Sequence, residues 1–175
     1  MQSSPPQWLT SLFEICDVTP LTYYPLQSNF SVLADWATIN STLHAAISAL
    51  PPTACILFQE LGCPSGYGNA SSTDGSSQVI QADFFAKAVT ELRRVGDHSS
   101  RPLRGLSAYT FMDPPPSQCV AEAAYYNITN LSFIEYLCTL GLVTADGAPK
   151  AAFEAFLAAL GPTNMSGVTR SDAST

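Results

Sequence analysis

Three side chains that can carry acid–base or hydrogen-bonding chemistry stand at the ends of predicted strands. They are Tyr24, Glu60 and Asp113. The carboxyl ends of parallel strands meet at one edge of a sheet, where ligand sites form, so these three would lie near one another if their strands pair in parallel. The simpler alternative is that a strand-end glutamate is a solvated residue and that an aspartate before three prolines caps a turn. Spacing alone leaves both interpretations open.

Other reactive residue types form no recognisable site. His44 and His98 join no metal-ligand spacing and no nucleophile–base motif, so we interpret both as structural. The segment Gly66-Tyr67-Gly68 does not open directly into a helix, as a phosphate-binding loop would. The sequence therefore predicts neither a metal nor a cofactor.

Composition and charge exclude several classes of partner. Of the 175 residues, 46% are hydrophobic and 12% are charged, and 7 Lys and Arg against 14 Asp and Glu give a formal charge of −7. A chain with this negative net charge lacks the positive electrostatic potential that attracts a polyanion, so nucleic acid and anionic membrane surfaces are excluded as main partners. No apolar run approaches the roughly 20 residues that a membrane-spanning helix needs.

Sequons and cysteines indicate the secretory pathway. Every asparagine begins an N-x-Ser/Thr sequon, a pattern that chance rarely produces. The five cysteines suit an oxidising compartment, although an odd number leaves at least one thiol free or paired outside the chain. Residues 1–6 lack the features of a signal peptide, so a secreted protein is expected to carry further residues upstream. The predicted glycosylation sites are Asn29, Asn40, Asn69, Asn127, Asn130 and Asn164.

Hydrophobic periodicity and turn residues give the order of elements. Strands are predicted over residues 17–24, 54–58 and 106–112, the first and third ended by prolines. Residues 63–77 and the segment after Pro116 are predicted as loops, and the polar tail 161–175 as disordered. Helices are predicted from Val32 to Leu50, from a cap at Ser76 or Ser77 to about Val95, from a cap at Ser132 to Leu140, and from Pro149 to Leu160.

This order of strands and helices, with crossovers long enough for parallel pairing, predicts the α/β class. An open sheet of three parallel strands leaves two edges and much apolar surface uncovered. A partner or further chain is therefore expected to complete it. An unrelated α/β module, such as a flavodoxin-like domain, would need more strands than the pattern offers.

Short motifs near the predicted strand ends occur in the order found in one enzyme family. The motif Tyr23-Tyr24-Pro25 follows the first strand, Gln59-Glu60-Leu61-Gly62-Cys63-Pro64-Ser65 follows the second, and Leu140-Gly-Leu142 precedes Asp146-Gly-Ala-Pro-Lys150-Ala-Ala-Phe153. Together they resemble the last three βα units of secreted (β/α)8 glycoside hydrolases of clan A, cellulase-like family 5 and its relatives. The resemblance implies a partial TIM barrel over residues 1–160, approximately strands six to eight with their helices.

The resemblance also implies roles for individual residues. Glu60 would be the nucleophile of a retaining enzyme, and Tyr24 would hold it by a hydrogen bond. Thr22 stands where the family often has a histidine, while Tyr109 and Phe111 stand where strand eight commonly carries a tryptophan under the sugar. The family's acid/base is the glutamate of an Asn-Glu pair, and no such pair occurs here. The implied function is hydrolysis of a β-linked poly- or oligosaccharide, in a fragment that is inactive by itself.

Two further expectations concern binding and cross-linking. Cys63 and Cys119 follow neighbouring strands, which predicts a disulfide between them. The expected partners are a carbohydrate substrate and the N-terminal half of the barrel; the alternative is a non-catalytic half barrel that binds glycans or serves a structural role. Aromatic rings in predicted loops could stack on sugars or merely cover a core edge. The candidate substrate-binding residues are Tyr67, Tyr109, Phe111, Asp113, Tyr125 and Tyr126.

Overall fold

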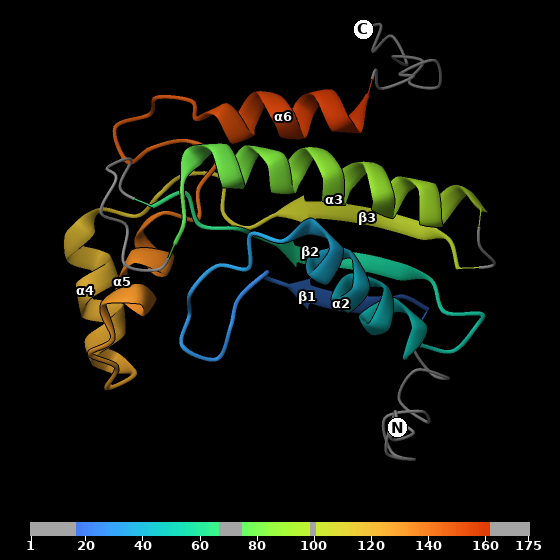
Figure 1. The fold of residues 1–175 in the computed structure, drawn as a ribbon, viewed down its shortest axis with the longest axis horizontal. Helices are drawn as coiled ribbons and strands as arrows, with labels where there is room; N and C mark the ends of the chain where they lie inside the picture. The colour runs from blue at the N-terminus through green and yellow to red at the C-terminus, as the bar shows by residue number, and fades with distance from the viewer. Residues whose placement is uncertain (1–16, 67–74, 99–100, 162–175) are drawn as a thin grey trace, which may run out of the picture.

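The computed structural model describes residues 17–66, 75–98 and 101–161, where three strands form one parallel sheet. The strands are β1 (Thr19–Tyr23), β2 (Ile56–Leu61) and β3 (Leu103–Ala108). The helices α2 (Trp36–Ser48) and α3 (Gln78–His98) connect successive strands, and α6 (Ala151–Leu160) packs on α3. Two further helices, α4 (Pro116–Tyr125) and α5 (Leu131–Cys138), lie beyond the carboxyl end of the sheet (Figure 1). The predicted α/β class is confirmed.

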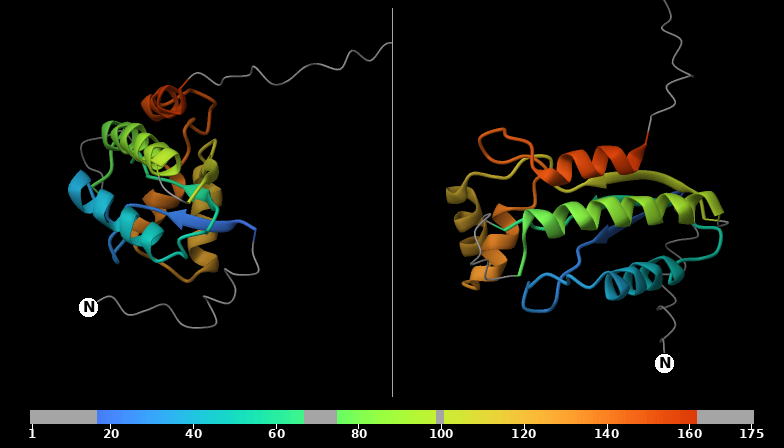
Figure 2. Two further views of the ribbon diagram at one scale, coloured as in Figure 1. Left: turned by 90° about the vertical axis from the view of Figure 1, so that its right-hand side faces the viewer. Right: turned by 45° about the horizontal axis from the view of Figure 1, so that its top comes forward.

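The core lies between the sheet and the two helices α2 and α3, which run side by side along it (Figure 2). Asp35 starts α2, because its carboxylate accepts a hydrogen bond from the Thr38 N–H at 2.9 Å. Ser77 starts α3, as predicted, since its hydroxyl accepts from the Ile80 N–H at 3.1 Å. The largest fully buried side chains include Leu43, Ile56, Phe58, Leu61, Phe84, Phe85 and Leu92.

The pairing of strands shifts next to Glu60. Leu21 pairs with Phe58 and Thr22 pairs with Glu60, so β2 has one residue more than β1 between these two pairs. The pairing of β2 with β3 shifts in the same stretch. An extra residue of this kind is a β-bulge, which re-aims the side chains beside it. Here it sets Glu60 opposite Thr22 while Leu61 remains buried in the core.

The third strand begins and ends earlier than predicted. It runs over Leu103–Ala108 rather than residues 106–112, because Ile56 at the start of β2 already pairs with Leu103. Asp113 therefore does not end a strand. Residues 109–112 lead from the sheet to it, and Met112 forms an isolated bridge with Val143.

The segment after Pro116, predicted as a loop, is helical instead and belongs to α4. Pro116 is the first residue of this helix, where the missing N–H of proline breaks no hydrogen bond. Cys119 and Ala123, four residues apart, are its buried positions. The predicted cap of the next helix is also wrong, because Asn130 rather than Ser132 starts α5 and its side chain accepts from the Ser132 N–H at 2.9 Å.

A disulfide joins α4 to α5. It links Cys119 with Cys138, whose Cα atoms are 5.5 Å apart. The predicted Cys63–Cys119 disulfide is therefore wrong. Cys63 lies buried just after β2, where its thiol is directed to the Pro64 carbonyl at 3.8 Å. The prediction placed Cys119 on a loop beside Cys63, whereas the helical turn of α4 directs it to α5.

The sheet is open at both edges within the described residues. β2 is its centre and β1 and β3 are its edges. Open edges leave backbone N–H and C=O groups unpaired, and parallel sheets are normally covered on both faces. The sequence analysis expected further structure to complete the sheet, and this stays a prediction. The exposed strand residues are mostly polar: Pro20, Thr22, Gln59, Arg104 and Ser107.

Other expectations concern the chain as a whole. The predicted disordered tail lies outside the described residues from position 162 onward, and so does the segment before position 17. Among the described helices, none combines the length and the apolar character needed to cross a membrane.

Candidate active site

The carboxyl ends of β1 and β2 bring Tyr24 and Glu60 together. Tyr24 directly follows β1, and Glu60 is the next-to-last residue of β2. The Tyr24 hydroxyl donates a hydrogen bond to Glu60 Oε2 at 2.9 Å, and both side chains are half-buried. The bulge makes this contact possible, because it sets Glu60 opposite Thr22, which points to the same side of the sheet as Tyr24. The contact implied by the family resemblance is present in the structure.

Two further tyrosines contact the ring of Tyr24. The rings of Tyr109 and Tyr136 meet it edge-on, with centroids 6.3 Å and 5.5 Å away. Burial raises the pKa of Tyr24 well above its ordinary value. Burial likewise raises the pKa of Tyr136 to about 12. Both phenols keep their protons at neutral pH, so Tyr24 acts on Glu60 as a neutral hydrogen-bond donor.

Gly62 allows the backbone to pass close to these rings. A Cβ atom at this position would lie 2.5 Å from Tyr24 Cε1 and 2.7 Å from the Tyr109 carbonyl oxygen. The Gly62 N–H also donates to the Tyr23 carbonyl at 3.1 Å, which continues the pairing of β1 and β2 past the end of β2. Only glycine fits this close approach, and its absence of a side chain lets Tyr24 reach Glu60.

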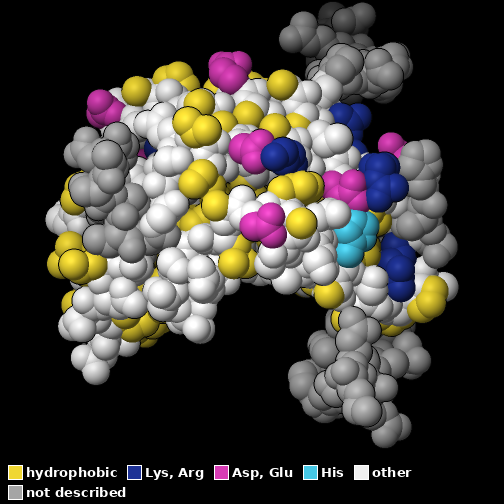
Figure 3. All heavy atoms as spheres, in the orientation of Figure 1, with side chains coloured by type: hydrophobic (Ala, Val, Ile, Leu, Met, Phe, Trp, Pro, Cys, Tyr) yellow, Lys and Arg dark blue, Asp and Glu magenta, His cyan; other side chains and the backbone are white. Residues whose placement is uncertain are grey.

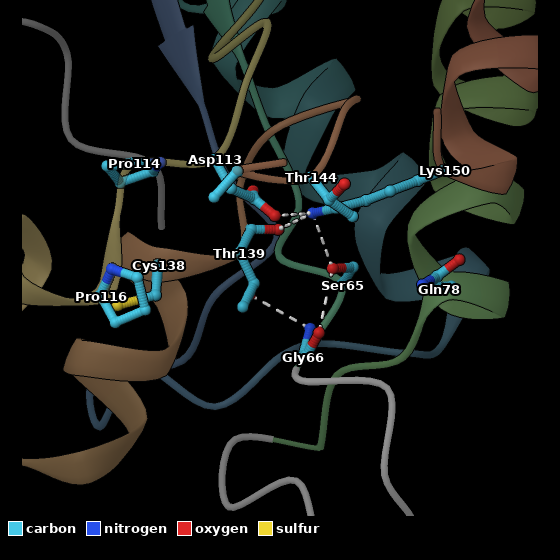
Figure 4. Close-up of a pocket in the computed structure, with 11 residues that line it drawn as sticks. Ser65, Gly66, Gln78, Asp113, Pro114, Pro116, Cys138, Thr139, Thr144 and Lys150 are labelled. Carbon is cyan, nitrogen blue, oxygen red and sulfur yellow. Dashed lines mark hydrogen bonds and ion pairs between the residues drawn. The ribbon is translucent and has the colours of Figure 1, made fainter. Parts of the chain in front are cut away.

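Asp113 lies in a buried network. Its Oδ2 atom is 2.6 Å from Lys150 Nζ, and its Oδ1 atom accepts from the Gly141 N–H at 2.7 Å. Lys150 Nζ also donates to Ser65 Oγ at 2.9 Å and to the Thr139 carbonyl at 3.1 Å (Figure 4). Only 9% of Asp113 and 4% of Lys150 are exposed. The network ties the segment after β3 to the loop after β2 and to the start of α6.

Burial acts against both charges of this pair. It raises the pKa of Asp113 and lowers the pKa of Lys150, and the ion pair opposes both shifts. The pair borders a cavity of about 200 Å³ whose walls include Gln78 and Thr144. Both oxygens of Asp113 have partners within the protein, so its part in substrate binding stays a prediction.

The other predicted sugar-binding residues within the described ranges are exposed and lie away from Glu60 in sequence, on the segment after β3 and at the end of α4. Phe111 is 60% exposed, and its ring packs edge-on against Phe153 of α6 with centroids 6.3 Å apart. Tyr125 is the last residue of α4 and Tyr126 its cap, and they are 83% and 60% exposed. Tyr67 lies outside the described residues. Of the predicted site residues, the structure brings together Tyr24, Glu60 and Tyr109.

The predicted glycosylation sites differ in access. Asn29, Asn127 and Asn130 are exposed. Asn40 lies within α2 and is half-buried, and its Oδ1 atom is buried with no hydrogen-bond partner among the described residues. The sequons at positions 69 and 164 lie outside the described residues. Access thus favours modification at the three exposed sites over Asn40.

No group of three or more His, Cys, Asp or Glu side chains in the described ranges is arranged to hold a metal ion. His44 instead contacts Glu91, with Nε2 and Oε1 2.6 Å apart. Arg94 donates to the same carboxylate through Nε at 2.9 Å. These three residues form a polar cluster where α2 and α3 meet.

Sequence reasoning missed the roles of Tyr136, Gly62 and Lys150. Tyr136 follows Phe133 by three residues on a strongly apolar helix, and a tyrosine on a buried stripe is a signal for a hydroxyl with a specific partner. Lys150 is one of only 7 basic residues, and a lysine beside an apolar helix signals a buried ion pair. Nothing in the sequence shows how closely Gly62 approaches Tyr24, because that contact depends on the pairing of two distant strands.

No protein-family model matches the chain, and no curated protein matches it in sequence. Solved structures match it in fold. Xylanase 10B from Thermotoga maritima has a TM-score of 0.50 and 12% identity, over 87% of this chain and 40% of that one. A thermostable mutant of xylanase Xyn10A from Cellvibrio japonicus has a TM-score of 0.50 and 17% identity, over 88% and 43%. The β-glucuronidase of Faecalibacterium prausnitzii has a TM-score of 0.50 and 16% identity, over 85% and 22%.

These neighbours are glycoside hydrolases, and at such identities the likeness shows the fold alone. The chain spans less than half the length of each of them. It therefore has an α/β fold with a three-stranded parallel sheet that matches part of a larger TIM-barrel enzyme. The α/β class and the likeness to part of a TIM-barrel enzyme agree with the sequence analysis, and the correspondence to strands six to eight stays a prediction.

Proposed function

We propose that this chain is the carboxyl-terminal part of a retaining glycoside hydrolase, with β1, β2 and β3 as strands six, seven and eight of a (β/α)8 barrel. The observation that carries the proposal is the 2.9 Å hydrogen bond from Tyr24 to Glu60 at the carboxyl ends of adjacent parallel strands. The fold likeness to xylanases and β-glucuronidases supports the class of enzyme. The substrate in this proposal is a β-linked oligo- or polysaccharide.

Glu60 is the nucleophile of the proposed reaction. In a retaining enzyme a carboxylate oxygen bonds to the anomeric carbon while the bond to the leaving oxygen breaks. Tyr24 donates to Oε2 of Glu60 and leaves Oε1 to attack, which makes Tyr24 a positioning residue. Because burial raises the pKa of Tyr24, its phenol keeps donating at neutral and moderately alkaline pH.

The acid/base of the proposed reaction belongs to another part of the barrel. Retaining enzymes place a second carboxyl group about 5–5.5 Å from the nucleophile. The family resemblance implies that this group is the glutamate of an Asn-Glu pair, which the sequence lacks. Since the chain matches only 40% and 43% of the two xylanases, we expect the acid to come from strands outside the matched portion.

A covalent trap tests Glu60 without needing the acid. A dinitrophenyl fluoroglycoside has a leaving phenolate that departs without protonation, so the first step needs only the nucleophile. Glu60 Oε1 bonds to the anomeric carbon, the phenolate leaves with the electron pair of the broken bond, and the fluorine at carbon 2 slows release of the sugar. The full chain is incubated with the glucose and xylose reagents, and its peptides are mapped by mass spectrometry.

We expect a fluoroglycosyl group on the peptide that contains Glu60, and none in Glu60→Gln. The control is Glu154→Gln, which changes an exposed carboxylate of α6 and should be labelled like the wild type. An unlabelled wild type, or label that persists in Glu60→Gln, would contradict the assignment of the nucleophile.

A second candidate function is non-catalytic glycan binding. The observation that favours it is the exposure of two adjacent rings, Tyr125 at 83% and Tyr126 at 60%. Exposed aromatic rings offer flat apolar surfaces to sugar faces. Under this alternative the trap leaves Glu60 unlabelled, while retention of the chain on an immobilised oligosaccharide persists and is lost in Tyr125→Ala.

We further propose that the protein is a secreted glycoprotein. The exposure of Asn29, Asn127 and Asn130 supports this proposal, since each of them begins a sequon. Glycopeptide mapping of the protein from its natural source should find glycans at these positions and the lowest occupancy at Asn40. Unmodified peptides at all three exposed sites would contradict the proposal.

A further inference from the structure

A second cavity lies beside Tyr109, between the end of the sheet and the helices α4 and α5. Its volume is about 300 Å³. Gln118 and Glu122 of α4 and Leu137 of α5 line it, together with Tyr109 and Met112. This volume is at the lower end of the range for small-molecule sites, so the cavity suits one small ligand or one unit of a polymer.

The polar groups of this cavity form a matched pair. Gln118 and Glu122 are four residues apart on α4, and Gln118 Nε2 donates to Glu122 Oε1 at 3.0 Å. A carboxylate can accept several hydrogen bonds, and an amide offers a second N–H and an oxygen. The pair therefore presents acceptors beside a donor, which complements two adjacent hydroxyl groups of a sugar. Tyr109 and Met112, 45% and 43% exposed, supply apolar surface for the C–H face of the ring.

The charge of the cavity sets which sugars it can accept. Among its described lining residues there are two carboxylates, Glu122 and Asp113, and no Arg or Lys. The ion pair with Lys150 already neutralises Asp113, whereas Glu122 has only the neutral amide of Gln118 as its hydrogen-bond partner in the described chain. On the face shown in Figure 3, charged side chains gather over α3 and are sparse over the end formed by α4 and α5. A sugar carboxylate would meet like charge at Glu122 without a compensating cation.

Tyr109 connects this cavity to the Tyr24–Glu60 pair. Its ring meets the ring of Tyr24 with centroids 6.3 Å apart, and its N–H donates to the Leu61 carbonyl at 2.9 Å. The contacts between the cavity and the candidate nucleophile thus run through two adjoining rings, those of Tyr109 and Tyr24. The disulfide between α4 and α5 fixes two of its walls relative to each other, which reduces the ordering that binding requires.

We propose that this cavity, defined by Tyr109, Gln118 and Glu122, is a binding subsite for a neutral pyranose unit and selects against uronic acids. The inference rests on the proposed glycoside hydrolase function for its place in that mechanism, where it would hold a sugar unit on the far side of Tyr109 and Tyr24 from Glu60. It deepens that proposal because the structural neighbours include both xylanases and β-glucuronidases, and it assigns this chain to neutral sugars.

Two matched probes test the selectivity. Methyl β-glucopyranoside and methyl β-glucuronide differ only at carbon 6, which is the carbon of a hydroxymethyl group in one and of a carboxylate in the other. Each is titrated into the nitrogen-15-labelled full chain, and backbone amide shifts report binding. We expect the neutral glycoside to shift amides near Tyr109 and Glu122 and to bind at least about tenfold more tightly at low salt, with a smaller ratio at high salt.

Variants separate charge from shape. Glu122→Gln keeps the shape and removes the charge, so the two affinities should come within about twofold of each other. Gln118→Ala should weaken binding of the neutral glycoside about fivefold by removing one hydrogen-bonding group. The control Glu154→Gln changes a carboxylate on α6 and should keep the wild-type preference.

Equal or tighter binding of the glucuronide, or amide shifts confined to other regions, would overturn the subsite. Failure of the proposed catalytic function gives a different result, because Glu60 does not line the cavity. Selective binding of the neutral glycoside with no covalent label on Glu60 supports the subsite and contradicts the assignment of Glu60 as the nucleophile. A covalent label on Glu60 with no preference for the neutral glycoside supports the nucleophile and contradicts the subsite.

Discussion

Glu60 and Asp113, two carboxylates near the carboxyl end of the sheet, have opposite surroundings. Glu60 is half-buried and accepts a hydrogen bond from the neutral phenol of Tyr24. Asp113 is buried and meets the ammonium group of Lys150 and a backbone N–H. In the sequence the two look alike, each an acidic residue near the end of a predicted strand. The partner of a carboxylate, rather than its position along the chain, separates a group that can react from one that holds the fold.

The difference has a chemical reason. A neutral donor orients a carboxylate and leaves it its charge, so one oxygen can still attack an electrophile. A buried ammonium group neutralises the charge, and separating the pair to free an oxygen would leave two uncompensated buried ions. We therefore expect changes at Asp113 and Lys150 to act mainly on stability, and changes around Glu60 to act mainly on reactivity.

The largest expected effect comes from breaking the buried pair. Lys150→Met leaves Asp113 buried without its cation and should lower the free energy of unfolding by about 3–5 kcal/mol. Urea unfolding followed by circular dichroism measures the change. Adding Asp113→Asn to this variant should recover part of the loss, because the uncompensated charge is then removed.

The matched control is Lys87→Met. Lys87 Nζ lies 2.7 Å from Asp83 in an exposed pair on α3, so this variant should lose less than about 1 kcal/mol. Equal losses for the buried and the exposed lysine would show that Asp113 does not depend on its cation, and the contrast with Glu60 would then disappear.

A smaller effect is expected from Gly62→Ala. The added methyl group would lie 2.5 Å from Tyr24 Cε1 and 2.7 Å from the Tyr109 carbonyl, so a ring or the backbone must shift. We expect a loss of about 1–3 kcal/mol in unfolding free energy, together with slower covalent trapping at Glu60 because Tyr24 is displaced.

Gly105→Ala is the control for this change. A Cβ atom there would meet only Leu57 Cδ1, at 2.8 Å, which is the end of a flexible side chain. The variant should lose less than about 1 kcal/mol and trap at the wild-type rate. If both glycine variants behaved alike, close packing at Gly62 would not be what holds Tyr24 in place.

The fold could be predicted from the sequence where periodicity was strong. The α2 and α3 helices and all three strands exist where apolar patterns predict them. The bounds of two strands differ most, since β2 runs over Ile56–Leu61 rather than 54–58 and β3 over Leu103–Ala108 rather than 106–112. The α4 helix does not follow from the sequence pattern, because the three prolines before Ser117 favour a loop, although proline at the first helical position is compatible with a helix. The wrong disulfide followed from the predicted loop, since a helix and a loop direct Cys119 to different neighbours.

The candidate site could be predicted only in part. Strand ends and the family resemblance located Tyr24, Glu60 and Tyr109, which the structure brings together. The bulge in β2, the packing against Gly62 and the Asp113–Lys150 pair depend on contacts between segments far apart in the chain. The local pattern of residue types does not determine such contacts, so the different surroundings of Glu60 and Asp113 are seen only in the three-dimensional structure.

Tyr24→Phe removes the phenol that holds Glu60 and should have a moderate effect. We expect a loss of about 1 kcal/mol in unfolding free energy, as for a typical hydrogen bond. The rate of covalent trapping at Glu60 should fall about tenfold, since a carboxylate without its donor is less well oriented.

The neighbouring tyrosine is a matched control. The Tyr23 hydroxyl donates to the Ile39 carbonyl at 3.1 Å, away from Glu60, so Tyr23→Phe should lose a similar free energy with no change in trapping rate. A similar slowing in both variants would indicate general loosening of the sheet rather than a positioning role for Tyr24.

The smallest effect concerns a third carboxylate, Glu91 of α3, which accepts a hydrogen bond from Arg94 and contacts His44 of α2. The hydrogen bond from Arg94, helped by His44, lowers the pKa of Glu91 from 4.5 to about 2. A carboxyl group whose pKa is lower in the folded state stabilises the fold above its unfolded pKa, and this contribution is lost as pH falls from about 4.5 toward about 2. Unfolding free energies of the wild type and Glu91→Gln should therefore converge across this window and stay separated by a constant amount above it. Parallel curves through the acid range would mean that Arg94 and His44 give the Glu91 carboxylate no more stability than a neutral amide would have. The surface cluster would then differ from the buried Asp113–Lys150 pair in kind as well as in size.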